Sequence, residues 1–126
     1  MAEMTPKQVV SEFVELFYGQ TKVREAFTKY VKEDYIQHNP IADDGRNAAI
    51  EVLERVRGEF PGTNVQVKRI IAEGDLVVVH SHGRRTEEDL GAAIVDIFRV
   101  EEGMVAEHWD VVQMIPEESL NGHDMV

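Results

Sequence analysis

The second half of the chain is a succession of runs rich in β-branched residues, separated by turn residues. The runs are residues 64–72, 73–85, 91–100 and 104–115; Gly74-Asp75 makes one turn and Glu101-Glu102-Gly103 another. Runs of this kind, joined by such short turns, are typical of antiparallel strands. Because an antiparallel sheet has to pack at least one face on a core, the remainder of the chain must supply the cover.

Amphipathic helices are predicted in the first part of the chain. Thr5 as N-cap and Pro6 at the first helical position open a helix that Gly19 ends. A shorter helical piece covers residues 22–31, and a third helix covers 42–62, opened by Asp43 or Asp44. The apolar stripes of these helices are Val9, Val10, Phe13 and Phe17; Val23, Phe27, Tyr30 and Val31; and Ala49, Val52, Leu53, Val56 and Phe60. Helices followed by a meander predict a single α+β domain, residues 1–126, with helices on one face of an antiparallel sheet.

The charge and cysteine content exclude several classes of function. The net charge is −11, which repels phosphate backbones, so nucleic acid is not expected as a partner. The absence of cysteine excludes disulfides, a thiol nucleophile and cysteine-ligated zinc. No signal-peptide pattern opens the sequence and no apolar run could span a membrane, so we expect a cytoplasmic protein with no membrane partner.

Alternation along the strands predicts that both faces of the sheet are partly apolar. We expect one face to meet the helices and the other to be too apolar for free exposure to water. That second face is predicted to contain Val77, Val79, Val95, Ile97, Trp109 and Val111. A homodimer through the sheet would cover it, and a curled sheet covered by the chain's own termini is the alternative.

Three ionisable residues interrupt the two strands of the last hairpin. A three-residue loop over 101–103, with Gly103 left-handed, would place Asp96 opposite His108 and Ile94 opposite Asp110. Asp96, His108 and Asp110 would then share one patch, among Ile and Val, where an unpaired charge costs several kcal/mol. The patch is either a structural hydrogen-bond network or a pocket in which a carboxylate transfers protons.

The remaining histidines leave further alternatives open. His38, in "YIQHNP", is either a surface residue or a group at the mouth of such a pocket. His80 and His82 lie on one face of their strand, and an adjacent strand could bring them to the patch. A His-x-His pair also raises a metal site, but it supplies only two ligands, and the others would have to come from His38, Asp96 or His108.

Several segments together resemble the SnoaL-like polyketide cyclases, a family of the nuclear transport factor 2-like superfamily. They are "YIQHNP" after two helices, "GDLVVVHSH", "VDIFRVEEGMVAEHWDVVQ" and "PEESLNGHDMV". The resemblance implies a cone: a strongly bent antiparallel sheet around the helices, with a deep pocket inside. It also implies that dimers through the outer sheet face are common.

The resemblance implies roles for individual residues. Asp110 would be the acid/base residue, Asp96 would correspond to an acid that hydrogen-bonds an oxyanion, and His38 falls where ketosteroid isomerases carry a carboxylate base. The pocket would bind substrate through Tyr35, His80, His82, Phe98 and His108. No metal or other cofactor is expected.

The predicted function is therefore acid/base catalysis on an apolar carbonyl compound, such as aldol cyclisation or isomerisation. In this mechanism Asp110 removes a proton next to the carbonyl, and His38 or Asp96 donates to the enolate oxygen. A non-catalytic, dimeric ligand-binding module is the second hypothesis, and a metal-dependent enzyme using the histidines is the third.

Overall fold

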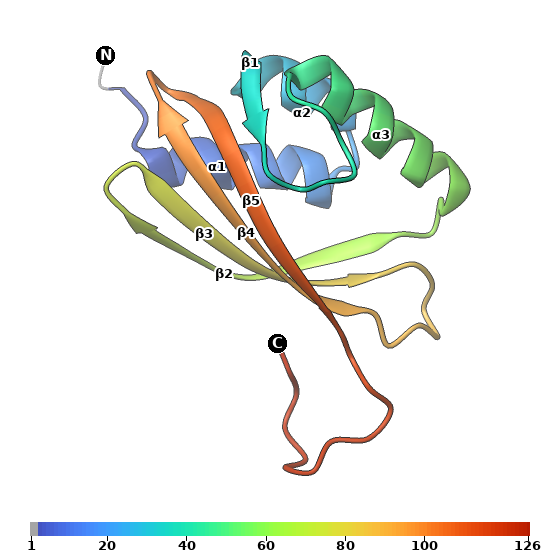
Figure 1. The fold of residues 1–126 in the computed structure, drawn as a ribbon. Coiled ribbons are helices and arrows are strands. Elements are labelled where there is room, and N and C mark those ends of the chain that lie inside the picture. Colours follow the sequence, from blue (N-terminus) through green and yellow to red (C-terminus); the bar gives the residue numbers. More distant parts are fainter. Residues whose placement is uncertain (1–2) are drawn as a thin grey trace.

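A five-stranded sheet forms the base of the molecule, and the helices lie on one side of it (Figure 1). The computed structural model describes residues 3–126. The strands are β1 (Val31–Gln37), β2 (Asn64–Glu73), β3 (Leu76–Arg84), β4 (Ala92–Glu101) and β5 (Met104–Met114). Their order is β1-β5-β4-β3-β2. The α+β prediction is confirmed, with the helices held in the concave face of the bent sheet.

The helical elements are α1 (Pro6–Val14), a π-helical segment η1 (Glu15–Gly19), α2 (Val23–Tyr30) and α3 (Arg46–Glu59). Thr5 caps α1 as predicted: its hydroxyl accepts from the Gln8 backbone N–H, and the Gln8 side chain accepts from the Thr5 backbone. The predicted start of α3 is wrong, because its N-cap is Gly45, at φ +99°. Asp44 instead accepts a hydrogen bond from the backbone N–H of Gln37. None of the helices in residues 3–126 has the length and apolar character needed to cross a bilayer.

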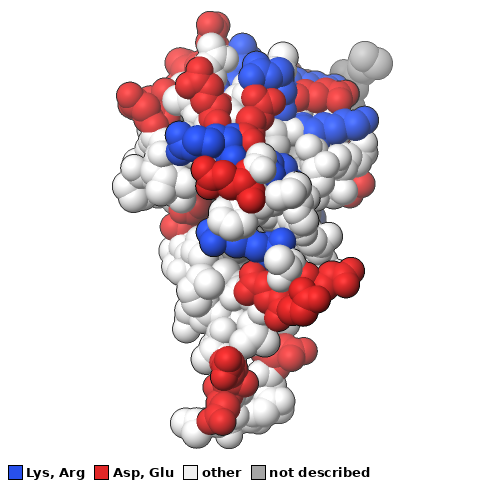
Figure 2. Space-filling view, turned by 90° about the vertical axis from the view of Figure 1, so that its right-hand side faces the viewer, with Lys and Arg blue, Asp and Glu red and all other residues white. Residues whose placement is uncertain are grey.

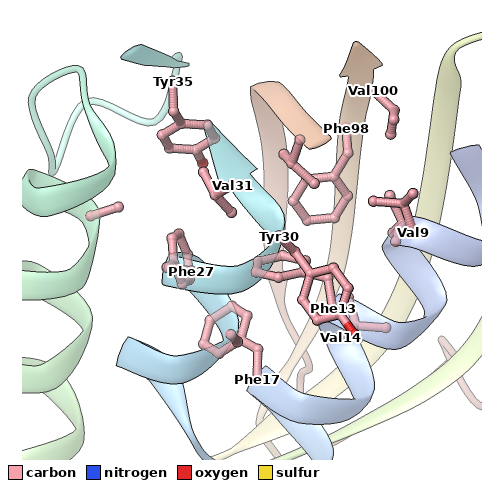
Figure 3. Packing of buried hydrophobic residues seen from close by; sticks show 14 of the residues in the cluster. Val9, Phe13, Val14, Phe17, Phe27, Tyr30, Val31, Tyr35, Phe98 and Val100 are labelled. Atoms are coloured by element: carbon pink, nitrogen blue, oxygen red, sulfur yellow. The ribbon is translucent and has the colours of Figure 1, made fainter. Parts of the chain in front are cut away.

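The core lies between the helices and the concave face, and aromatic rings fill its centre (Figure 3). The Phe13 ring packs edge-on against Phe27 and against Phe98 of β4, with centroids 5.1 and 5.6 Å apart. All the predicted stripe residues of α1 and α2 are buried. On α3 the buried pair is Ala49 and Ile50, whereas Val52, Leu53, Val56 and Phe60 are half-buried, because α3 covers a cavity as well as the core.

A fifth strand, β1, was not predicted from the sequence. The second helix stops at Tyr30, and Val31 begins a strand that runs parallel to β5, pairing Gln37 with His108. The sheet is consequently mixed, not purely antiparallel. A parallel neighbour distant in sequence leaves no turn signal next to it, which is why the segment read as helix end and loop.

The register of the β4–β5 hairpin also differs from the prediction. The turn has two residues, Glu102 and Gly103, at φ +54° and +78°, and the register shifts between Arg99 and Val100. Gly103 is left-handed as expected, but Asp96 lies opposite Asp110, and Phe98 lies opposite His108. The ionisable residues still share one face, because the register differs by an even number of positions.

The assignment of β3 to the faces of the sheet was wrong. Val77 and Val79 are fully buried, and they pair with Phe98 and Asp96 on the concave face. On the outer face, Leu76 and Val78 of β3 take the place predicted for Val77 and Val79. The residues predicted there from β4 and β5 do lie on the outer face. It comprises Ile71, Leu76, Val78, Val95, Ile97, Trp109 and Val111. We call this set the outer apolar face.

Candidate active site

A small cavity of about 90 Å³, open to solvent at its mouth, lies between α3, the η1 segment and the concave face of β4 and β5. Its apolar lining is Phe13, Phe17, Phe27, Ile41, Ala42, Ala49, Val52, Leu53 and Phe98. Its polar lining is Tyr18, Tyr35, Gln37, Asn39, Asp96, His108 and Asp110. Of the predicted site residues, Tyr35, Asp96, Phe98, His108 and Asp110 therefore meet in one pocket, a shape and composition typical of small-molecule sites.

Asp96 is held at the base of this pocket by two donors. The side chain is 3% exposed, and its Oδ1 lies 2.8 Å from Nε2 of His108. Its Oδ2 accepts a hydrogen bond of 2.7 Å from the hydroxyl of Tyr18. Burial, and then the Asp96 charge, raise the pKa of Tyr18 well above its usual value, so Tyr18 stays protonated and donates. The predicted contact between Asp96 and His108 is confirmed.

Gln37 determines which ring nitrogen of His108 carries a proton. Its Oε1 accepts from the backbone N–H of Asn39, which fixes the orientation of the amide, and the same oxygen lies 2.8 Å from Nδ1 of His108. Nδ1 must therefore donate, so one further proton lies between Nε2 and Asp96. Whichever of the two groups holds that proton, the Asp96–His108 pair has no net charge.

Asp110 faces Asp96 across the hairpin and is bound by an amide instead of a cation. Nδ2 of Asn39 donates to both carboxylate oxygens of Asp110, at 3.0 and 2.9 Å. The orientation of this amide is also fixed, because Oδ1 of Asn39 accepts from the backbone N–H of Ile41. Asp110 is half-buried at the pocket wall, and no lysine or arginine lines the cavity within the described chain. Asp110 thus carries the unbalanced negative charge of the site.

Tyr35 offers the pocket a hydroxyl hydrogen. Its oxygen accepts a 3.0 Å hydrogen bond from Nε2 of Gln37, and no acceptor for its own hydrogen lies among residues 3–126. Burial, and then the Asp96 charge, raise the pKa of Tyr35 far above its usual value, so the proton is retained. The site therefore presents a carboxylate, a neutral donor and apolar walls together.

Three predicted site residues lie outside the pocket. Nε2 of His38 is 2.7 Å from Oε2 of Glu107, and its ring stacks on Trp109 of the outer apolar face at 4.8 Å. His80 and His82 also point outward, since they pair with Val95 and Ala93. His80 contacts Arg69, and His82 lies 2.8 Å from the carbonyl oxygen of Leu90. His80 and His82 do not reach the pocket, because β3 presents its opposite face to the helices. His38 takes the surface position that the sequence had left as one of two alternatives, against Glu107 and Trp109.

Tyr18, Gln37 and Asn39 belong to the site and were not identified from the sequence. Tyr18 follows the buried Phe17 in a π-helical segment, whose extra residue per turn shifts the helical periodicity. Gln37 and Asn39 flank His38 in the sequence, at the edge of the sheet. This alternation was the one sequence signal that could have placed them in the site. An extended segment that sends His38 outward must send its neighbours inward.

One group in the described chain could hold a metal ion. Asp96, His108 and Asp110 each offer one ligand atom, all within 4.8 Å of one another. Carboxylate and imidazole ligands suit several divalent metals. However, Nε2 of His108 already contacts Asp96, and its Nδ1 donates to Gln37, so a metal would have to displace part of this network. The His-x-His metal site raised as an alternative is not assembled in the described chain, since His80 and His82 lie on the other face.

Comparison with known proteins gives one family match and many similar folds. The family model described as SnoaL-like domain matches residues 10–108. No curated protein sequence shows a significant match.

The similar solved structures include IdmH of Streptomyces antibioticus, described as a candidate polyketide cyclase. IdmH is 18% identical to this chain; the match covers 86% of this chain and 92% of IdmH, with a TM-score of 0.67. A candidate isomerase of the SnoaL-like family from Agrobacterium tumefaciens is 14% identical, over 87% and 99% of the two chains, with a TM-score of 0.71. An NTF2-like protein of unknown function from Cytophaga hutchinsonii is 15% identical, over 89% and 93%, with a TM-score of 0.70. At these identities the likeness shows a shared fold.

Proposed function

The chain belongs to the SnoaL-like domain family, and from that premise we propose that it is a cofactor-independent acid/base enzyme acting on an apolar carbonyl compound. The reaction is of the aldol-cyclisation or isomerisation type. The observation that carries the proposal is the placement of Asp110, a carboxylate with an amide partner and no cation, in a pocket walled by aromatic rings.

Asp110 is the general base. A carboxylate bound to arginine or lysine loses basicity, whereas the amide of Asn39 orients Asp110 without neutralising it. The neutral Asp96–His108 pair opposite leaves the negative charge of the site on Asp110. Asp110 removes a proton from the carbon next to the substrate carbonyl, and the bonding electrons pass to the carbonyl oxygen as an enolate.

Tyr35 is the donor to the enolate oxygen. Its hydrogen has no acceptor in residues 3–126, and its raised pKa keeps that hydrogen in place. One donor aimed at a developing oxyanion is worth about 3 kcal/mol. The enolate carbon then attacks a second carbonyl of the same molecule, or takes the proton back from Asp110 at a conjugated position. In the aldol case that proton goes to the new alkoxide.

His38, His80 and His82 have no part in this mechanism, since they lie on the outer side of the sheet. Asp96 is a positioning residue, because its carboxylate holds the side chains of His108 and Tyr18 in place. Tyr35, Phe98 and His108 keep the substrate-binding role that the family resemblance implied for them. The aromatic lining favours a planar, uncharged ring system near the base.

We also propose that two copies of the chain associate through the outer apolar face. Ile71, Leu76 and Val111 are 60%, 41% and 66% exposed there, and Val78, Val95, Ile97 and Trp109 lie between them. A contiguous apolar surface of this extent is typical of an interface. A second copy presents the same residues about a two-fold axis, and this makes the surface self-complementary.

Deuterium exchange tests the base without knowledge of the natural substrate. The protein is incubated in D₂O with an aryl ketone such as tetralone, and loss of the protons next to the carbonyl is followed by NMR. We expect wild type to accelerate exchange and Asp110→Asn to lose about 100-fold or more of that acceleration, with unchanged circular dichroism. His80→Gln, on the outer face, is the matched control and should exchange like wild type.

Full exchange activity in Asp110→Asn would refute the assignment of the base. A wild-type protein that binds the ketone tightly but exchanges none of its protons would instead support the non-catalytic ligand-binding function.

A further inference from the structure

We infer that the site takes an elongated ligand, with an apolar body and an anionic group at its far end that Arg84 and Arg85 bind. The inference rests on the proposed function for the position of the carbonyl end. It adds a second binding region, a groove at the open end of the concave face. The groove is lined by Phe60, Thr63, Val65, Gly83, Arg84, Arg85, Thr86, Asp89, Gly91, Ala92, Ile94, Val112 and Met114.

The groove continues the pocket along the same face of the hairpin. Asp96 and Asp110 form a pair in the pocket wall; the next pair on that face is Ile94 with Val112, and then Ala92 with Met114. Met114 lies four positions beyond Asp110 in β5, which is about 13 Å along the strand. α3 runs in the same direction, since Ala49 and Leu53 cover the pocket and Phe60, just beyond its end, lines the groove.

Two glycines allow the chain to pack closely against itself beside the groove. A Cβ at Gly83 would lie 2.8 Å from Cδ1 of Ile94, and a Cβ at Gly91 would lie 2.0 Å from the carbonyl oxygen of Gly83. Gly91 also has φ +80°, a left-handed conformation that favours glycine. Atoms of the protein itself fill both Cβ positions, so the two glycines fix the path of the chain at the edge of the groove. Ile94, Val112 and Met114 supply the apolar contacts. Val112 and Met114 are 53% and 69% exposed, so these contacts are unused within the described chain.

The charge at the far end of the groove is positive, in a chain whose net charge is −11. Neither Arg84 nor Arg85 forms a salt bridge with a carboxylate among residues 3–126. The guanidinium of Arg85 lies 4.1 Å from the centroid of the Phe60 ring, and the guanidinium of Arg84 donates, among residues 3–126, to the carbonyl oxygen of Glu87 alone, at 3.5 Å.

Asp89 also lines the groove; backbone groups donate to its carboxylate, and Arg84 and Arg85 act on it through their charge without a salt bridge. Its oxygens accept from the backbone N–H groups of Arg85 and Gly91, which lower its pKa. Figure 2 views this side of the molecule and shows basic side chains at mid-height, beside a cluster of acidic ones and above largely uncharged surface. The two guanidinium groups are thus available to a carboxylate or phosphate of the ligand.

A matched pair of probes tests the groove by binding alone. One probe is an acetylnaphthalene carrying a hexanoate tether through an ether oxygen, and the other is the methyl ester of the same compound. Isothermal titration should show that the wild-type protein binds the acid more tightly than the ester. Arg84→Gln/Arg85→Gln should weaken binding of the acid about fivefold to tenfold and leave the ester unchanged. Arg55→Gln, on the exposed side of α3, removes a positive charge outside the groove and should change neither.

Equal affinity for acid and ester in wild type, a preference that survives in the double variant, or no binding of the acid would each overturn the inference. The result is separable from the proposed chemistry, because Asp110→Asn is expected to bind the acid as wild type does even though it fails to exchange protons. If the protein exchanges protons but binds the acid and the ester equally, the proposed function stands and the inference about the groove is overturned.

Discussion

A histidine–carboxylate pair lies on each side of β5, and the two pairs differ in their surroundings. On the concave side Nε2 of His108 lies 2.8 Å from Asp96, and the side chains are 10% and 3% exposed. On the outer side Nε2 of His38 lies 2.7 Å from Glu107, with 43% and 17% exposed. Nearly the same distance therefore occurs in a buried network and in a more exposed surface cluster that also contains Arg99.

The comparison teaches that burial, not bond length, decides what such a pair does. Water and salt screen the outer pair, so either partner can be lost at little cost. In the buried pair, removal of one partner leaves the other without compensation in an apolar site. The buried pair can therefore fix proton positions, whereas the outer pair is part of a surface.

The largest expected difference is in stability. His108→Leu should lower the free energy of unfolding by about 3 kcal/mol, because Asp96 stays buried without its partner. His38→Leu should lower it by less than about 1 kcal/mol. Urea denaturation of the two variants measures both values. Equal losses would show that the two sides of β5 are not energetically distinct.

Association is the next expected effect. If the outer apolar face is a dimer interface, Ile97→Glu buries a charge there and should weaken the dimer by about 2 kcal/mol, or about 30-fold. Leu120→Glu changes an equally apolar residue in the exposed C-terminal segment and is the control. Sedimentation equilibrium measures both. A monomeric wild-type protein would contradict the proposed interface.

At alkaline pH the pocket should lose stability. The pKa of Tyr35 and of Tyr18 is raised above the usual 10.0, so above about pH 10 the unfolded chain releases protons that the folded chain retains, and stability falls as pH rises. Each such tyrosine removes up to about 1.4 kcal/mol per pH unit. Tyr35→Phe should flatten this decline more than Tyr30→Phe, whose hydroxyl lies outside the pocket and bonds to Glu12. Denaturation between neutral pH and pH 11 checks it, and an unchanged alkaline decline in Tyr35→Phe would contradict it.

At acid pH the outer cluster should give the smallest effect. Hydrogen bonds from His38 and then Arg99 lower the pKa of Glu107 below its usual 4.5, so its contribution is present above about pH 4.5 and is lost as pH falls further. Glu107→Gln should flatten this acid decline by less than about 1 kcal/mol, and by less still in high salt. Thermal denaturation from pH 3 to 7 measures it. An effect as large as that of His108→Leu would abolish the distinction between the two sides.

Much of the fold followed from local pattern. Thr5 and Pro6 start α1 where predicted, and β4 and β5 lie within one residue of their predicted bounds, since caps, turns and β-branched runs are local signals. β1 could not be predicted in the same way, because its pairing with β5 is parallel and spans the sequence from Val31 to Val105. Nothing next to Val31 in the sequence signals that partner.

The candidate site was predictable to the same extent. Asp96, His108 and Asp110 share a face by alternation alone, and a register change of two positions leaves that face unchanged. The face that β3 presents to the helices was not predictable, because Val77 and Val79 alternate with equally apolar neighbours. His80 and His82 were assigned to the pocket because the wrong face of β3 was chosen.

By itself the sequence determined the elements, the hairpin and the set of ionisable residues on its concave face, because periodicity and turn chemistry act over a few residues. Only the tertiary structure decided which side chains complete the site. The path of residues 37–39 around β5 sends His38 to Glu107 and Trp109, and brings Gln37 to His108 and Asn39 to Asp110. That outcome depends on packing between segments about 70 residues apart, where a shift of one position would exchange the two sides.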